Sequence, residues 1–253
     1  MILKTSYTII IFIFGMSLLC ASVYGHASPT TYNPQQNQIF HSIQSIPDKL
    51  TIAFSERPEI KASSIKVTDQ NNNRIDKNDL SLAGSEEKLS VSLDKSKVKT
   101  GTYTVNWIAL SKDDGHITKG SYVFSVDNNN NSSKQQQSQV SNQSLPTFSK
   151  SFINNNVNLT LSISPYKVGN NIFNLTAIGL DGKPVGNVSN VFLTFNNPEK
   201  DIGPIPNTMK QISVGKYTTN GNFISQTGNW EINLVVQRVG QYDINQKFDI
   251  QIQ

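Results

Sequence analysis

Short stretches of alternating apolar and polar residues, separated by Gly, Pro and Asn, constrain the fold of this chain more than any other feature. In a β-strand, side chains two apart project to the same side, so alternation indicates a strand with one buried face. In the first half the pattern covers Lys49–Ser55, Ser63–Thr68, Lys88–Leu93, Thr102–Leu110 and Val123–Val126. No amphipathic helical pattern accompanies these stretches. Many short strands with turn residues between them predict an all-β sandwich or barrel.

The second half repeats the same kind of pattern after a polar break. Its predicted strands are Val157–Ile163, Asn171–Thr176, Asn190–Phe195, Lys210–Val214, Trp230–Val236 and Lys247–Ile252. The break is rich in Asn, Gln and Ser and has almost nothing to bury, which predicts a flexible linker. We therefore expect one β domain over residues 26–127, a linker over 128–148 and a second β domain over 149–253.

The first 25 residues have the parts of a secretory signal. Lys4 is their one charge, an apolar run covers Thr8–Leu19, and small residues precede the expected cut. Cleavage after Gly25 would make His26 the first residue of a mature protein outside the cytoplasm, periplasmic or at the cell surface. The apolar run is shorter than the ~20 residues that a membrane helix needs. An uncleaved membrane anchor remains the alternative.

Composition excludes several functional classes. The single cysteine, Cys20, lies in the predicted signal, so the mature chain would offer no disulfide and no thiolate ligand. The formal net charge is +4, or +3 without Lys4, and no Lys/Arg stripe is present, so nucleic acid is not an expected partner. The chain also lacks a Gly-rich phosphate loop and the G-x-S-x-G and H-E-x-x-H motifs. We therefore expect a protein that is not an enzyme.

The chain contains three histidines, and two of them fit a metal site. Asp114 and His116 are two residues apart around Gly115, so in extended chain they share one face. The alternative is a hairpin loop whose polar residues face water. Signal removal before His26 would create a terminal amine beside an imidazole, and the two can bind one metal ion together. With Asp114 and His116 the donors become three nitrogens and one oxygen, a set that suits Cu(II). Protons compete for these donors, since a free α-amine has a pKa of about 7.7–8.0, so affinity should fall at low pH.

The segment from His26 to Val126 resembles the CopC family of extracytoplasmic copper-binding proteins. The matching pieces are His26-Ala27, Pro34, Phe54-Ser-Glu56, Asp114-Gly-His116, Gly120 and Phe124-Ser-Val126. The resemblance implies a Greek-key β-barrel, immunoglobulin-like in its strand arrangement, with a high-affinity Cu(II) site. Its implied ligands are His26 through amine and imidazole, Asp114 and His116. Glu56 is implied to be a weak axial ligand or a hydrogen-bond partner beside the ion.

Three features depart from the family pattern or lack a role in it. Two residues separate Ser111 from Asp114 where the family more often has one, so Asp113 could compete with Asp114. Met209 is the one methionine after the predicted signal, so a methionine-rich Cu(I) site is not expected. His41 has no family role, and we expect it on the surface.

The second half resembles the YtkA-like domain that accompanies CopC domains and the CopD membrane protein in some fusions. Matching pieces include Asp181-Gly-Lys-Pro184 and Gly228-Asn-Trp230. This half contains no His or Cys, so the resemblance implies an immunoglobulin-like docking or spacer module. The expected function is copper homeostasis: buffering, resistance, or import and delivery as a copper chaperone, with a CopD-like membrane protein or a copper enzyme as partner.

Two alternatives belong to other functional classes. The first is a two-domain extracytoplasmic interaction or structural protein with an idle metal site. The second is a copper oxygenase that attacks polysaccharides, since such enzymes also use an N-terminal histidine. Those enzymes keep one ligand position open for oxygen, which Asp114 would fill here, so the sequence favours binding over catalysis.

Overall fold

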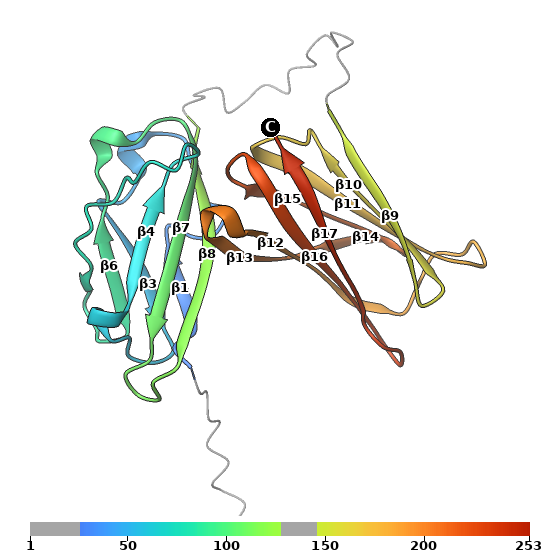
Figure 1. The fold of residues 1–253 in the computed structure, drawn as a ribbon, viewed down its shortest axis with the longest axis horizontal. Helices are drawn as coiled ribbons and strands as arrows, with labels where there is room; N and C mark the ends of the chain where they lie inside the picture. The colour runs from blue at the N-terminus through green and yellow to red at the C-terminus, as the bar shows by residue number, and fades with distance from the viewer. Residues whose placement is uncertain (1–25, 128–145) are drawn as a thin grey trace, which may run out of the picture.

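The structure, a computed structural model, describes residues 26–127 and 146–253, and each part forms a β-sandwich (Figure 1). The predicted signal and residues 128–145 of the predicted linker lie outside the described residues. Helical structure in the described parts is limited to four 3-10 turns: η1 (Ile43–Ser45), η2 (Ile60–Ala62), η3 (Lys95–Lys97) and η4 (Pro198–Lys200). Across the same residues, no helix has the length and apolar character needed to cross a membrane. The all-β prediction is confirmed.

The N-terminal sandwich consists of two four-stranded sheets. The first has the order β1 (Pro29–Asn33), β3 (Lys49–Phe54), β6 (Lys88–Ser92) and β5 (Ser81–Leu82). The second, called here the inner sheet because it faces the C-terminal half, has the order β2 (Ile39–Phe40), β8 (Ile117–Val126), β7 (Gly101–Leu110) and β4 (Ser64–Thr68). Neighbouring strands are antiparallel except β2 and β8.

The expected Greek-key β-barrel is wrong in one respect, because the sheet is not closed. Among the described residues no continuous ladder joins the two sheets. Three of the crossings between them run through irregular segments that carry η1, η2 and η3, which interrupt the strand ladder. At one edge the sheets are linked by an isolated bridge between Pro58 and Ser111. The N-terminal half is therefore an open sandwich.

Aromatic and β-branched side chains fill the space between these two sheets. The alternating apolar side chains of β3 and β7 are buried here, and Trp107 packs edge-on against Phe54 with ring centroids 5.6 Å apart. Gly120 lies opposite Trp107, and a Cβ there would come within 2.8 Å of the indole Cζ2. The glycine thus gives the indole room against β8.

The C-terminal sandwich has one five-stranded and one four-stranded sheet. The first has the order β14 (Lys210–Ser213), β15 (Lys216–Ile224), β11 (Gly169–Gly179), β10 (Val157–Ser164) and β9 (Phe148–Asn154). The second has the order β13 (Ile202–Thr208), β12 (Val188–Asn197), β16 (Gly228–Arg238) and β17 (Ile244–Ile252). Strand β9 begins at Phe148, where the linker was expected to end. The alternation did not predict β13, whose Pro204 and Pro206 suit the edge position that it takes.

The two sandwiches touch directly along the outer face of the inner sheet. Val123 on β8 is fully buried and packs with the apolar core of the C-terminal half. The Thr104 hydroxyl donates to Ser225 Oγ at 2.7 Å, and the Gly203 N–H donates to Ser121 Oγ at 2.7 Å. In Figure 1 the C-terminal half lies on the side of β8 and β7 away from β1 and β3. A flexible connection alone was expected between the halves, and this packed contact was not.

We expect Val123→Asp to separate the two halves. The substitution puts an unpaired carboxylate where a fully buried valine packs, at a cost on the order of several kcal/mol. Small-angle X-ray scattering should show a larger radius of gyration while each sandwich stays folded by circular dichroism. Ile117→Asp is the matched control, because Ile117 lies on the same face of β8 and is 67% exposed. Equal scattering curves for wild type and Val123→Asp would contradict the contact.

Candidate metal site

The loop between β7 and β8, Ser111–His116, is organised by one buried hydroxyl. Ser111 Oγ accepts hydrogen bonds from the backbone N–H groups of Asp113 and Asp114 at 3.1 and 3.2 Å. The Ser111 N–H donates to His116 O, and its carbonyl accepts from the Gly115 N–H. These bonds close a tight turn in which Gly115 takes a φ of +76°, a conformation that favours glycine.

Asp114 and His116 lie together because of this turn. Asp114 Oδ1 accepts a hydrogen bond from the His116 N–H at 2.9 Å, and Asp114 Oδ2 lies 2.9 Å from His116 Nδ1. The spacing of the two residues predicted this neighbourhood through extended chain. In the structure the two residues are neighbours for another reason than extended chain: the loop forms a tight turn, and the Asp114 carboxylate bonds to the His116 N–H across it.

His26 reaches the same carboxylate from the other end of the domain sequence. Its Nδ1 is 3.3 Å from Asp114 Oδ2, and its ring centroid is 4.4 Å from that of His116. One ligand atom from each of His26, Asp114 and His116 can be chosen so that all lie within 4.8 Å of one another. All three residues are exposed, so an ion could reach them from solvent.

The chain on either side of the His26 carbonyl is held in place. Ser55 Oγ donates to the His26 carbonyl at 2.9 Å, and Thr118 Oγ1 donates to the Ala27 carbonyl at 2.6 Å. The Ala27 side chain is fully buried. The chain before β1 is thus fixed to the residue that follows β3 and to β8, which limits where the His26 ring can lie.

Glu56 connects the His26 main chain to the loop. Its Oε1 accepts from the His26 N–H at 3.3 Å, and its Oε2 accepts from Ser111 Oγ at 2.5 Å. Both carboxylate oxygens are therefore engaged, and Glu56 is outside the group of three residues whose ligand atoms converge. Of its two expected roles, this geometry favours hydrogen-bond partner over ligand.

The two neighbouring aspartates of the loop have separate tasks. Arg57 donates from Nε to Asp113 Oδ1 at 3.0 Å and from its main-chain N–H to Oδ2 at 3.2 Å, and the same guanidinium lowers the pKa of Asp113. Asp113 is thus turned away from the histidines and does not compete with Asp114. The pKa of Asp114 lies well below its usual range, chiefly because its carboxylate accepts a hydrogen bond from the His116 N–H. Ser111 and both imidazoles lower this pKa further, whereas desolvation raises it. Asp114 therefore stays an anionic donor until the pH is far into the acid range.

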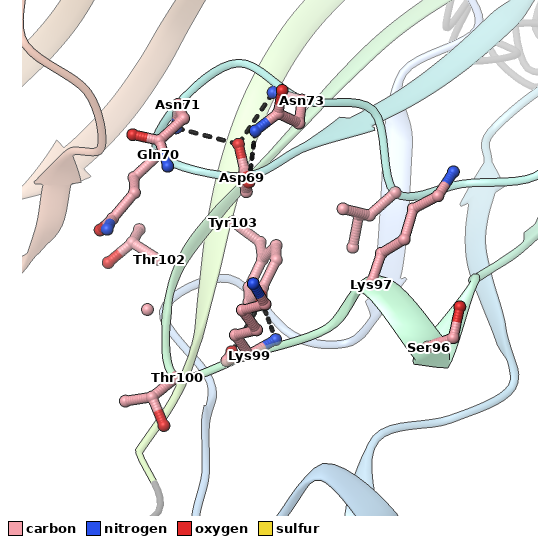
Figure 2. Close-up of a pocket in the computed structure, with 12 residues that line it drawn as sticks. Asp69, Gln70, Asn71, Asn73, Ser96, Lys97, Lys99, Thr100, Thr102 and Tyr103 are labelled. Atoms are coloured by element: carbon pink, nitrogen blue, oxygen red, sulfur yellow. Dashed lines mark hydrogen bonds between the residues drawn. The ribbon is translucent and has the colours of Figure 1, made fainter.

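Away from the metal loop, the described residues form no second group of three converging metal-ligand side chains. His41 is exposed, as expected. A cavity of about 450 Å³ lies beside the start of β7, at the end opposite the Ser111–His116 loop. Figure 2 shows the residues that line it. There Asp69 accepts from the N–H groups of Asn71 and Asn73 and from the Asn73 amide, while Tyr103 bonds to the Lys99 main chain (Figure 2). This cavity presents no converging set of metal donors.

Comparison with known proteins identifies the family of the N-terminal half. The family model described as the CopC domain matches residues 30–127. Protein YobA from Escherichia coli K12 is 36% identical over 110 residues, which cover 44% of this chain and 86% of YobA. Protein YobA from Shigella flexneri matches with the same figures. This chain belongs to the CopC family.

Two solved structures are similar to about 40% of the chain. CopC from Methylosinus trichosporium OB3b is 25% identical and covers 40% of this chain and 94% of its own, with a TM-score of 0.34. PcoC from Escherichia coli, described as a methionine-rich copper resistance protein, is 24% identical and covers 40% and 99%, with a TM-score of 0.33. The match to the CopC domain ends at residue 127, so the YtkA-like character of the second half stays a prediction.

We expect Ser111→Ala to loosen the metal loop without unfolding the CopC domain. The substitution removes the buried hydroxyl that bonds to the amides of Asp113 and Asp114 and to the carboxylate of Glu56. The free energy of unfolding should fall by about 1–3 kcal/mol. Hydrogen exchange at these two amides should become at least about tenfold faster. Ser64→Ala, at an exposed serine on β4, is the control. Unchanged exchange in Ser111→Ala would show that the hydroxyl does not organise the loop.

Proposed function

We propose that this chain is an extracytoplasmic protein that binds one Cu(II) ion and serves copper homeostasis. The observation that carries the proposal is the convergence of the His26, Asp114 and His116 side chains, with the His26 main-chain nitrogen beside them at Glu56. After cleavage of the predicted signal that nitrogen would be a free amine. The proposed ligands are the amine and imidazole of His26, the carboxylate of Asp114 and the imidazole of His116.

The donor set favours Cu(II) over other ions. Three nitrogens and one carboxylate oxygen suit a tetragonal site, and the Irving–Williams order ranks Cu(II) above its divalent neighbours. A Cu(I) site would call for soft donors, and Met209 is instead buried in the core of the C-terminal half. Membership of the CopC family supports copper as the metal.

The surrounding contacts suit this role. Asp114 would bring a full negative charge to the ion, because its carboxyl stays ionised. Glu56 would accept a hydrogen bond from the coordinated amine and orient that amine, in the way that outer carboxylates orient metal ligands generally. Since all three side chains are exposed, the ion could be passed to a partner without opening the fold.

The proposal extends to location and partners. Removal of the signal places the site outside the cytoplasm, and a CopD-like membrane protein or a copper enzyme would receive or supply the ion. The three side chains and the amine would occupy four ligand positions, which leaves no equatorial position for oxygen chemistry. We therefore propose a binding and delivery role and no catalysis.

Loss of any proposed ligand should weaken Cu(II) binding by at least about 100-fold, because even changes to groups behind the ligands cost 10–100-fold. The variants are Asp114→Ala, His116→Ala and an added Gly before His26, which converts the amine into an amide. Affinity is measured by competition with a Cu(II) chelator of known stability.

The controls are Asp113→Ala and His41→Ala, which should keep wild-type affinity because Asp113 faces Arg57 and His41 lies on the surface. An extended chain that binds as tightly as the mature one would rule out the amine as a ligand. If Asp113→Ala lowered the Cu(II) affinity as much as Asp114→Ala, Asp113 would have to be considered a ligand in place of Asp114.

Glu56→Gln should weaken Cu(II) by about 10–100-fold, less than loss of a ligand, because it removes charge and orientation from behind the site. Competition with the Cu(II) chelator measures this change in affinity. The electron paramagnetic resonance spectrum of the bound Cu(II) should keep its nitrogen couplings. A loss as large as that of Asp114→Ala would instead make Glu56 a ligand.

A further inference from the structure

A second site lies in the groove between the two sandwiches, apart from the metal loop. We propose that this groove binds the phosphate group of a small anion. It has a volume of about 160 Å³ and is lined from both halves of the chain, by β4, β7 and β8 on one side and by the end of η4 and the start of β13 on the other. The proposal does not depend on copper, so its failure would leave the proposed function untouched.

Strand register brings the N-terminal wall together. Lys66 on β4 is paired with Asn106 on β7, which is paired with Ser121 on β8. In the next row of the same outer face, Ile108 is paired with Lys119. The two lysines therefore stand on one face of the sheet in adjacent rows, just beyond the area that the C-terminal half covers.

The floor of the groove is fixed by a hydrogen-bond chain that crosses the two halves. Ser121 Oγ donates to Asn106 Oδ1 at 2.5 Å and accepts from the Gly203 N–H at 2.7 Å. Because the amide oxygen of Asn106 is used in this chain, its Nδ2 is the part left to serve the groove, as a donor. The floor is thus pre-ordered and presents a donor.

The charges around the groove are unbalanced. Lys66, Lys119 and Lys200 line it, and Asp201 is the single carboxylate among the lining residues. None of the three lysines forms an ion pair in the part of the chain that the structure describes. Three ammonium groups around one small groove repel one another, and a bound anion would remove that repulsion.

The arrangement of donors selects among anions. The lysines come from three different elements, Lys66 and Lys119 on the N-terminal wall and Lys200 on the opposite wall, so cations line both sides of the groove, and Asn106 adds a donor from the floor. A planar carboxylate presents two oxygens, whereas a phosphate presents several in a tetrahedral arrangement and can accept from all sides. Lysine binds phosphate as a point charge, which does not require the planar geometry of arginine. A ligand here would contact both sandwiches and so hold them together by linkage.

The test is isothermal titration of the copper-free two-domain chain with inorganic phosphate and with pyrophosphate at low ionic strength. The groove variant is Lys66→Gln with Lys119→Gln and Lys200→Gln. The matched control is Lys77→Gln with Lys183→Gln and Lys210→Gln, three exposed lysines outside the groove, which changes the net charge equally. Circular dichroism checks that both triple variants fold.

We expect the groove variant to lose at least about tenfold in affinity and the control to stay within about twofold. Asp201→Asn should act in the opposite direction and tighten binding, because it removes the one negative charge of the lining. Flotation with phosphatidylglycerol vesicles distinguishes the source of the phosphate: groove-dependent binding to vesicles but not to free anions would identify a lipid headgroup.

Three results would overturn the proposal. The first is the absence of binding to free phosphates and to vesicles. The second is an equal loss in the control, which would reduce the effect to net charge. The third is an unchanged or weakened affinity in Asp201→Asn.

Discussion

The hydrogen bonds of the Ser111 hydroxyl are the interaction on which the metal site depends. Ser111 is buried, accepts from two amides of the loop and donates to Glu56, which in turn accepts from the His26 main chain. One side chain thus joins the loop after β7 to residues that lie far earlier in the sequence. Because the three proposed ligand residues are themselves exposed, their positions must be set by such contacts behind them rather than by packing.

The C-terminal sandwich divides the outer face of the inner sheet into two parts. The part near the start of β7 is covered, which explains the burial of Thr104, Ser121 and Val123. The part near the metal loop is uncovered, with Ile108 38% and Ile117 67% exposed. The second half therefore packs firmly on the CopC domain and still leaves the metal loop open, an arrangement that suits an ion meant to be exchanged.

Sequence reasoning identified many of the longer strands through alternation, because burial of one face is a local property of each strand, but it missed β13 and β15. It also joined His26, Asp114 and His116 into one donor set from their chemistry, and the family resemblance implied the same set, although nothing local relates residue 26 to residue 114. The Arg57–Asp113 pair, the Ser111 hydroxyl and the contact of Val123 with the second core were not predicted. Each depends on tertiary neighbours, and an outward-facing valine on β8 looks the same in sequence whether water or another domain covers it. The open sandwich in place of a barrel has a similar cause, because closure depends on how the sheets meet at their edges.

The central claim is that one Cu(II) ion binds to the released amine of His26, two imidazoles and one carboxylate. Electron–nuclear double resonance of the Cu(II)-loaded, natively secreted chain, uniformly labelled with ¹⁵N, tests it most directly. The account predicts three directly coordinated nitrogens, of which one is not an imidazole. Two nitrogens that are both imidazoles, or four nitrogens without a carboxylate oxygen, would contradict it.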